Sequence, residues 1–376
     1  MAAPAEIERE VVRAYAAFLA SAYEDSLDSA REMEKQIAAF VGQPTSAGLE
    51  RPRAAWIAAR GPYLMTEIGR FYGGPIDDGR NIEDQLNAWP VDESFIEGAP
   101  DSPSPGLVQN EREFPELTPA VLARLNARGG EENISCGWHA IEFLLWGPDI
   151  RADAPGQRRA SDFATDRFAS RRCAFLLAAT RLLVDDLDVV AREWKAAPGT
   201  YRAEFEAAPA QALAHIFTAL YQLSGFEMAS ERLLIGIDTQ SQEDEPDCFS
   251  DTTSQDFLWN ARAMAGVWHG RWTRRDGSKL NGRALREFVA ARNKEMGHLL
   301  DEKFAECLAQ AEKLPAPFDQ IILQPDGTPE KEALLRFAEG LEFQADLLAH
   351  FAREQNLEIE FEHAETPVSP RGTGEK

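Results

Sequence analysis

Apolar residues recur at intervals of three and four along most of the chain, which is the spacing of one face of an α-helix. A first long helix is predicted from about Ile7 to Val41, and a second from about Leu49 to Tyr72, before Gly-Gly-Pro at 73–75. The same periodicity predicts helices at about 135–146, 160–195, 208–235, 254–270, 283–313 and 330–354. No segment alternates as a strand would, so the pattern predicts an all-α fold.

Two helical-bundle domains are expected, because single cores rarely grow past roughly 250–300 residues and this chain has 376. The segment 151–157 has the composition of a linker, so the boundary is predicted there, between an N-terminal domain at 1–152 and a C-terminal domain at 153–365. Residues 366–376 are predicted to be a disordered tail. Residues 73–134 are rich in turn formers, and so long an irregular stretch is usually functional. A short similarity between 70–77 and 232–238 is either chance or the trace of an internal duplication.

The composition is that of a globular protein, with 44% hydrophobic and 27% charged residues, but the net charge is −24. So acidic a chain argues against a nucleic-acid partner, since a phosphate backbone requires a basic surface. Acidity suits cation attraction or simply solubility. No apolar run approaches the roughly 20 residues of a membrane span. The N-terminus lacks the pattern of a signal peptide, so the protein is either cytoplasmic or an exported one shown without its signal.

The four cysteines do not indicate a zinc site, because none form a CxxC pair and their spacing fits no zinc template. The sequence is compatible both with free buried thiols and with disulfides at these positions. They stand at Cys136, Cys173, Cys248 and Cys307.

The sharpest chemical signal is Gly137-x-His139-x-x-Glu142 within a short predicted helix. His139 and Glu142 are three residues apart, so their side chains leave one face of the helix. Di-iron bundles use the mirror order, Glu-x-x-His, at the same separation. Gly137 leaves room for another helix or a ligand. Either His139 simply hydrogen-bonds Glu142 in a core, or the pair binds a metal; its apolar neighbours require that it be paired or bound.

This motif and several segments in the same order resemble the imelysin family, whose signature is GxHxxE. The similar segments lie at 53–78, 86–94, 243–256 and 314–323, so the resemblance covers about residues 8–355. It implies two four-helix-bundle domains, a site at their interface, a link to iron uptake, and a periplasmic or outer-membrane-associated protein. The family also carries a peptidase-like label. Where its acidic loop usually has histidines, this chain has Pro246-Asp247 and Thr253-Ser254, which argues against a metal-binding role for that loop.

Further ligands are needed, since two are too few for a tight metal site. Glu67 stands three residues before Arg70, as an intrahelical ion pair or as a third ligand that would lie near His139. Asp92 and Glu93 would cap a helix or supply oxygen ligands. Asp251 is expected to cap the following helix and to line the site.

Three functions are compatible with these residues. The first is an iron-binding protein that serves iron uptake or handling, with other iron-uptake or membrane-associated components as partners, because one imidazole with carboxylates suits iron. The second is a metallopeptidase that uses His139 and Glu142 as zinc ligands, although no HExxH is present and the ligand set is incomplete. The third is a non-catalytic protein that binds a peptide or small molecule.

Overall fold

The protein is described by a computed structural model over residues 4–98, 105–151 and 153–359; the predicted tail at 366–376 lies outside these ranges. The longer helices are α1 (Pro4–Gly42), α2 (Ser46–Leu64), α7 (Gly137–Trp146), α8 (Ala169–Glu193), α10 (Pro209–Tyr221), η3 (Gln222–Leu234), α12 (Thr253–His269), α13 (Leu285–Arg292), α14 (Lys294–Ala311) and α16 (Pro329–Glu354). Shorter ones are η1 (Glu67–Gly69), α3 (Ile82–Asn87), α4 (Glu93–Ile96), α5 (Gly106–Gln109), α6 (Pro119–Leu125), η2 (Ala160–Phe163), α9 (Tyr201–Ala207), α11 (Ile235–Thr239), η4 (Gln242–Asp244) and α15 (Phe318–Ile322). The prediction of an all-α fold is confirmed.

Two strands complete the structure, β1 (Arg271–Thr273) and β2 (Lys279–Asn281). They pair antiparallel with Trp272 opposite Leu280. Gly277 has a φ of +83°, which a glycine adopts without strain in the turn between them. The hairpin follows α12 directly and is too short to form a sheet core.

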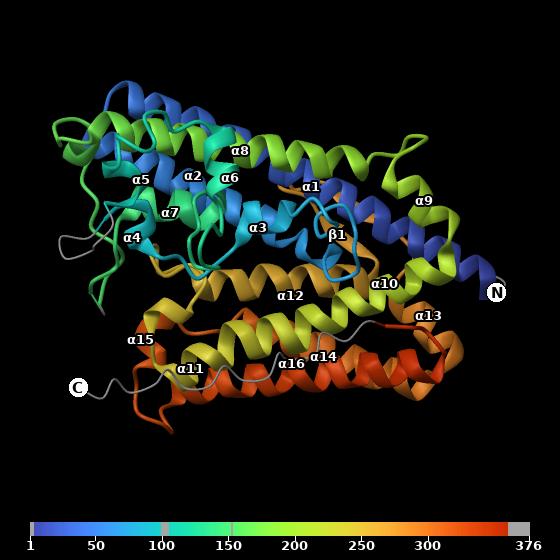
Figure 1. The fold of residues 1–376 in the computed structure, drawn as a ribbon. Coiled ribbons are helices and arrows are strands. Elements are labelled where there is room, and N and C mark those ends of the chain that lie inside the picture. The colour runs from blue at the N-terminus through green and yellow to red at the C-terminus, as the bar shows by residue number, and fades with distance from the viewer. Residues whose placement is uncertain (1–3, 99–104, 152, 360–376) are drawn as a thin grey trace.

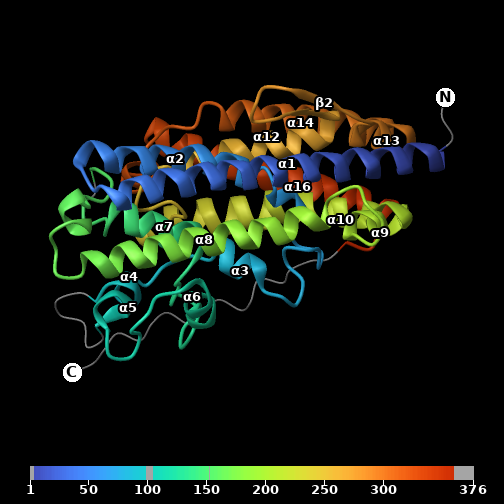
Figure 2. The ribbon, with the colours of Figure 1, turned by 90° about the horizontal axis from the view of Figure 1, so that it is seen from above.

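The helices form two layers, one above the other in Figure 1. α1, α2, α7 and α8 pack around one another in the upper layer, and α10 with η3, α12, α14 and α16 form the lower one. Figure 2 shows the short helices α3 to α6 along one edge, beyond α8. The domain boundary at 152 stays a prediction, and the packing of α8 against α1 and α7 favours a boundary after α8 instead.

The predicted second helix does not run to Tyr72, because α2 ends at Leu64. The Thr66 hydroxyl donates to the Tyr63 carbonyl at 2.6 Å, and the Thr66 amide donates to the same oxygen at 2.7 Å. These bonds tighten the chain into the 3₁₀ turn η1, after which Phe71 has a φ of +74°. The chain therefore leaves the helix direction before the glycines that the sequence suggested as its end.

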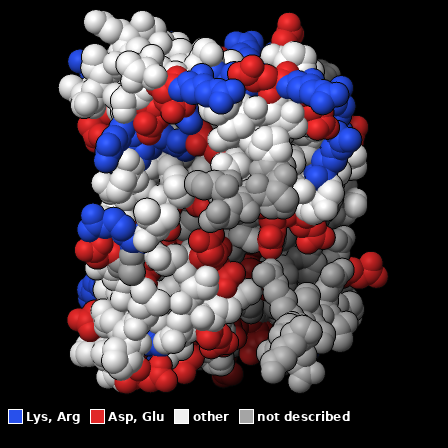
Figure 3. All heavy atoms as spheres, turned by 60° about the vertical axis from the view of Figure 1, so that its left-hand side comes forward, with Lys and Arg blue, Asp and Glu red and all other residues white. Residues whose placement is uncertain are grey.

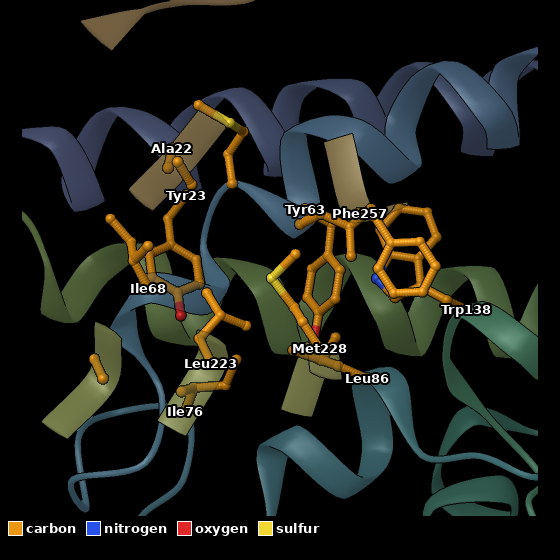
Figure 4. Packing of buried hydrophobic residues seen from close by; sticks show 14 of the residues in the cluster. Ala22, Tyr23, Tyr63, Ile68, Ile76, Leu86, Trp138, Leu223, Met228 and Phe257 are labelled. Atoms are coloured by element: carbon orange, nitrogen blue, oxygen red, sulfur yellow. The ribbon is translucent and has the colours of Figure 1, made fainter. Parts of the chain in front are cut away.

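A continuous apolar core joins the two layers. Figure 4 shows Tyr63 of α2 and Trp138 of α7 close to Met228 of η3 and Phe257 of α12. All four side chains are fully buried. This contact fixes α2 and α7 against α12, and so fixes the relative position of the polar residues that these helices carry between the layers.

The structure places all four cysteines as free thiols. Burial raises the pKa of Cys136 and Cys248, so these two behave as small apolar side chains. Within the described residues, no helix is long and apolar enough to cross a membrane.

Asp186 on α8 gives a test of the fold that does not involve the polar residues between the layers. Burial, with Asp185 beside it, raises its pKa to about 7, whereas an unfolded aspartate ionises near 4. The folded chain holds this proton over that range, so the contribution of Asp186 to stability is lost as pH rises from about 4 to 7. Asp186→Asn should raise the free energy of unfolding by about 1–2 kcal/mol at pH 8, after allowance for solvent screening, and by almost nothing at pH 4. Urea unfolding at both pH values measures this; an equal gain at both would contradict it.

Candidate metal centre

Helix α7 carries the Gly-x-His-x-x-Glu motif in the interior of the protein, and every one of its ten residues is buried. Gly137 begins the helix with a φ of +86°, and a Cβ there would lie 2.5 Å from the Leu86 carbonyl oxygen. Only glycine fits both the backbone angle and the close approach of α3. The Trp56 indole of α2 donates to the Trp138 carbonyl at 3.1 Å and holds the first turn of α7 in place.

His139 and Glu142 meet a third group, Asp247, from the loop before α12. His139 Nδ1 lies 3.2 Å from Glu142 Oε2 and 3.7 Å from Asp247 Oδ1. The three side chains are at most 1% exposed. One donor atom from each lies within 4.8 Å of the others, and this is the group of potential metal ligands that the described residues contain.

The loop that carries Asp247 is folded onto α7 by specific hydrogen bonds. The Ser250 amide donates to Glu142 Oε1 at 2.9 Å, and the Thr252 hydroxyl donates to Asp247 Oδ2 at 3.1 Å. The Asp247 amide donates to the Thr253 hydroxyl at 3.0 Å. The sequence-based argument against this loop rested on residue type, and the structure brings Asp247 of the loop to His139 and Glu142.

Arg60 of α2 is the cation beside these carboxylates. Its guanidinium lies 3.2 Å from Asp247 Oδ1 and 2.8 Å from Asp256 Oδ2, and it also donates to Asn87. Arg60 is 3% exposed and stays charged, since Asp247 and Asp256 outweigh the effect of its burial and raise its pKa. Arg60 alone faces three acidic side chains, and burial with the neighbouring acids raises the pKa of both Asp256 and Glu142, so the centre has capacity for additional positive charge.

The protonation states follow from burial. Burial, together with the nearby Arg60 and Arg232, lowers the pKa of His139 well below its usual value, so the imidazole is neutral at pH 7. Burial and Asp247 raise the pKa of Glu142 well above its usual value. A neutral imidazole is the form that binds metals. A cation would take the place of the proton on Glu142.

The donor atoms fit a metal ion in chemistry and in spacing. Metal–ligand bonds of about 2.0–2.2 Å separate neighbouring donors by roughly 3.0–3.6 Å, close to the two distances from His139 Nδ1. His139 Nε2 is buried without a hydrogen bond, and Asp247 Oδ1 has only its ion pair with Arg60, among the residues that the structure describes. Three protein ligands also leave coordination positions for water or another ligand.

Glu67 is buried between the layers but is not part of this cluster. Arg232 of η3 binds both its carboxylate oxygens at 2.9 Å, and the predicted ion pair with Arg70 is present at 3.2 Å. Asn260 donates to Glu67 Oε2 at 2.8 Å. Burial alone would raise the pKa of Glu67, but Arg232 outweighs it and holds that pKa well below the usual value. Glu67 is therefore an ionised, fully hydrogen-bonded group of the interface.

The remaining predicted site residues lie at the starts of α4 and α12. Asp92 caps α4 by accepting from the Ser94 amide at 2.9 Å, which confirms its predicted cap. The prediction that Asp251 caps α12 is wrong, because Thr252 occupies the N-cap position and Asp251 stands before it with a φ of +57°. Glu93 supplies no donor to the cluster of His139, Glu142 and Asp247.

Carboxylates gather outside the centre, at the end of the molecule that lies on the left in Figure 1. Figure 3 shows acidic side chains across the middle of this face, between the two layers. Burial and neighbouring acids raise the pKa of Glu93 and Asp251 to about 7 and that of Asp149 to about 6. An acidic face of this kind favours cations over anions in its neighbourhood.

The fold and the buried imidazole–carboxylate cluster define an all-α protein with a candidate metal centre between two helical layers. The family model for imelysin matches residues 19–344. The chain belongs to the imelysin family.

Two solved structures share the fold. An iron-regulated protein A precursor from Parabacteroides distasonis has a TM-score of 0.70 and 14% identity, over 92% of this chain and 95% of that one. An imelysin-like protein from Psychrobacter arcticum has a TM-score of 0.69 and 15% identity, over 96% and 99% of the two chains. No curated protein matches the chain. At these identities the likeness shows the fold alone.

Proposed function

We propose that this protein binds iron through His139, Glu142 and Asp247 and serves iron uptake or handling. The observation that carries the proposal is the buried cluster, in which a neutral imidazole faces two carboxylates at metal-ligand spacing. Mixed imidazole and carboxylate donors are the ligands of non-haem iron sites. A structural neighbour is named an iron-regulated protein, which agrees with this metal.

The same neighbour is named a precursor, and we extend export to this protein as part of the proposal. The expected location is the periplasm or the outer membrane. Fractionation of the native producing cells, with an antibody against the protein, tests this. Recovery with cytoplasmic markers would contradict it.

Metal titration of the protein tests the iron proposal. Metal-free protein should take up about one equivalent of ferrous iron under anaerobic conditions, since the described residues contain one cluster with three potential ligands. Loss of a group that only hydrogen-bonds a metal ligand weakens metal binding by roughly 10- to 100-fold. His139→Ala and Glu142→Gln each remove a ligand itself, so each should weaken iron binding by more than that. Elemental analysis and calorimetry measure the stoichiometry and the affinity.

The matched control is His350→Ala. His350 also faces a glutamate, with Nε2 at 3.3 Å from Glu354 Oε1, but this pair is exposed on α16. Its removal should leave metal binding unchanged. Equal binding by wild type, His139→Ala and His350→Ala would contradict the proposal. Thermal unfolding of each variant shows whether a loss of binding reflects a loss of fold.

A competition titration with zinc and ferrous iron shows which of the two metals the protein prefers. A zinc peptidase also needs a general base beside the metal. Asp256, a buried carboxylate that shares Arg60 with Asp247, is held by that arginine at 2.8 Å. Chelator-sensitive hydrolysis of a denatured protein, lost in Glu142→Gln, would favour the peptidase over iron handling.

A further inference from the structure

A cavity lies away from the candidate metal centre, between α1, α2, α12, α14 and the β1–β2 hairpin. Its volume is about 770 Å³, which is in the range of small-molecule sites. Its wall is largely apolar and includes Ala22, Pro62, Met65, Ala265 and Trp272. All five are buried, so the wall is formed by fixed elements.

The cavity and the candidate metal centre lie on different faces of the same two helices. Arg60 of α2 and Asp256 of α12 contact each other at the centre. Pro62 and Trp259, further along the same helices, line the cavity. His139, Glu142 and Asp247 do not line it, so a ligand there would be held by another set of residues.

Positive charge is concentrated around this cavity although the chain has a net charge of −24. Five arginines line it, and only two acidic residues do, Asp25 and Glu312. Asp25 is already bound by Arg274 at 2.8 Å. The five are Arg262, Arg271, Arg274, Arg275 and Arg286.

Three of these guanidinium groups are available to a ligand. Within the described ranges, no ion pair holds the side chain of Arg262, Arg271 or Arg275. Arg286 has one long pair, at 3.7 Å from Asp301. Guanidinium groups present paired donors that match a carboxylate, and these three are exposed at the cavity, where an anion can reach them.

Aromatic rings stand beside these charges. Arg262 lies over the Trp259 ring with 5.0 Å to its centroid, and Trp272 stacks on Phe18 at 5.4 Å. A Cβ on Gly61 would lie 2.3 Å from Trp259, so the glycine lets this indole pack directly on α2. Burial and Arg286 lower the pKa of His269 in the same wall, which leaves a neutral imidazole for hydrogen bonding.

We propose that this cavity binds a small organic anion with an apolar aromatic body, whose acidic group is bound by Arg262, Arg271 and Arg275. The apolar wall with Trp272 takes the ring, and the arginines at the rim take the charge. The volume suits a ligand of one or two rings rather than a folded protein. This site is independent of the proposed iron centre.

Two probes that differ by one charged group test the proposal on the full chain. The first is 8-anilino-1-naphthalenesulfonate, and the second is N-phenyl-1-naphthylamine, which has the same rings without the sulfonate. The anionic probe should bind with a stoichiometry of one and more tightly than the neutral one, and added salt should weaken it. Fluorescence titration measures both. Equal binding of the two probes would overturn the proposal.

Two kinds of variant locate the site. The triple variant Arg262→Gln/Arg271→Gln/Arg275→Gln should weaken the anionic probe at least about tenfold and leave the neutral one unchanged. Ala58→Phe, at an exposed position lining the cavity, should exclude both probes without a change of charge.

The control removes three arginines from another cleft, on α1 and α8, where each is paired with acids: Arg31→Gln/Arg181→Gln/Arg192→Gln. This variant should bind the anionic probe as wild type does. An equal loss in both triple variants would mean a general charge effect and would overturn the proposal. His139→Ala should also retain the probe, which separates this result from that of the iron titration.

Discussion

Asp247→Asn should abolish high-affinity metal binding as completely as His139→Ala does. The asparagine keeps the shape of the side chain but removes the charge from the oxygen that lies 3.7 Å from His139 Nδ1. A neutral amide is a much weaker ligand than a carboxylate, and an imidazole with one carboxylate is an incomplete site. Titration of metal-free protein with ferrous iron measures the effect, which should exceed roughly 100-fold in affinity.

The fold should survive this substitution. Arg60 keeps Asp256 and Asn87 as partners, and an asparagine oxygen can still accept from the Thr252 hydroxyl. The thermal midpoint therefore separates loss of a ligand from loss of structure.

Asp244→Asn is the matched control for Asp247→Asn. It removes the same charge from the same stretch of chain, but Asp244 belongs to η4 and supplies no donor to the cluster. Its metal affinity should stay near that of wild type. If both variants lost affinity equally, the effect would come from the general negative field, and Asp247 would not be a ligand.

The sequence predicted half of this site because half of it is local. His139 and Glu142 share one helix, so their spacing alone places them together. Asp247 comes from a loop more than a hundred residues later, and its position depends on Ser250 and Thr252 bonding to α7 and to Asp247. The absence of the family's histidines argued against a role for this loop. That argument used residue type alone and contained no information about the path of the backbone.

Periodicity predicted where the helices lie, but it did not predict changes of helix type along one helical segment. The apolar pattern predicted one helix at about 208–235, where the structure has α10, the π-helix η3 and α11 in succession. A pattern of apolar residues three and four apart indicates that a segment is helical, but it does not tell which backbone bonds the helix makes, so the i→i+5 bonding of a π-helix was not predicted. The short helices α3 to α6 were missed because each is too short to show a period.

The similarity between segments 70–77 and 232–238 acquires a physical meaning in the structure. Arg70 and Arg232, the first residues of the two segments, both bind Glu67 and Glu227. Two arginines and two glutamates thus form one buried network between the layers. Internal duplication stays a prediction, and this pseudo-symmetric contact favours it.

Breaking this network should have the largest effect on stability. Arg232→Met removes the guanidinium that binds Glu67 at 2.9 Å and Glu227 at 2.6 Å. Glu67 is fully buried and Glu227 nearly so, and Arg70 alone does not neutralise both carboxylates. Loss of one partner from a buried ion pair costs about 3–5 kcal/mol, because a charge is left without compensation. Urea unfolding at pH 7.5 should show this loss, with both layers affected.

A second change should restore part of the stability. Arg232→Met/Glu67→Gln removes one of the uncompensated charges while the amide keeps the shape and one hydrogen-bond acceptor, so the double variant should be more stable than Arg232→Met alone. The control is Arg181→Met, which breaks an exposed pair with Asp185 at 3.0 Å and should change stability by at most about 0.5 kcal/mol. A similar small loss in Arg232→Met, or no recovery in the double variant, would show that the buried network does not hold the two layers together.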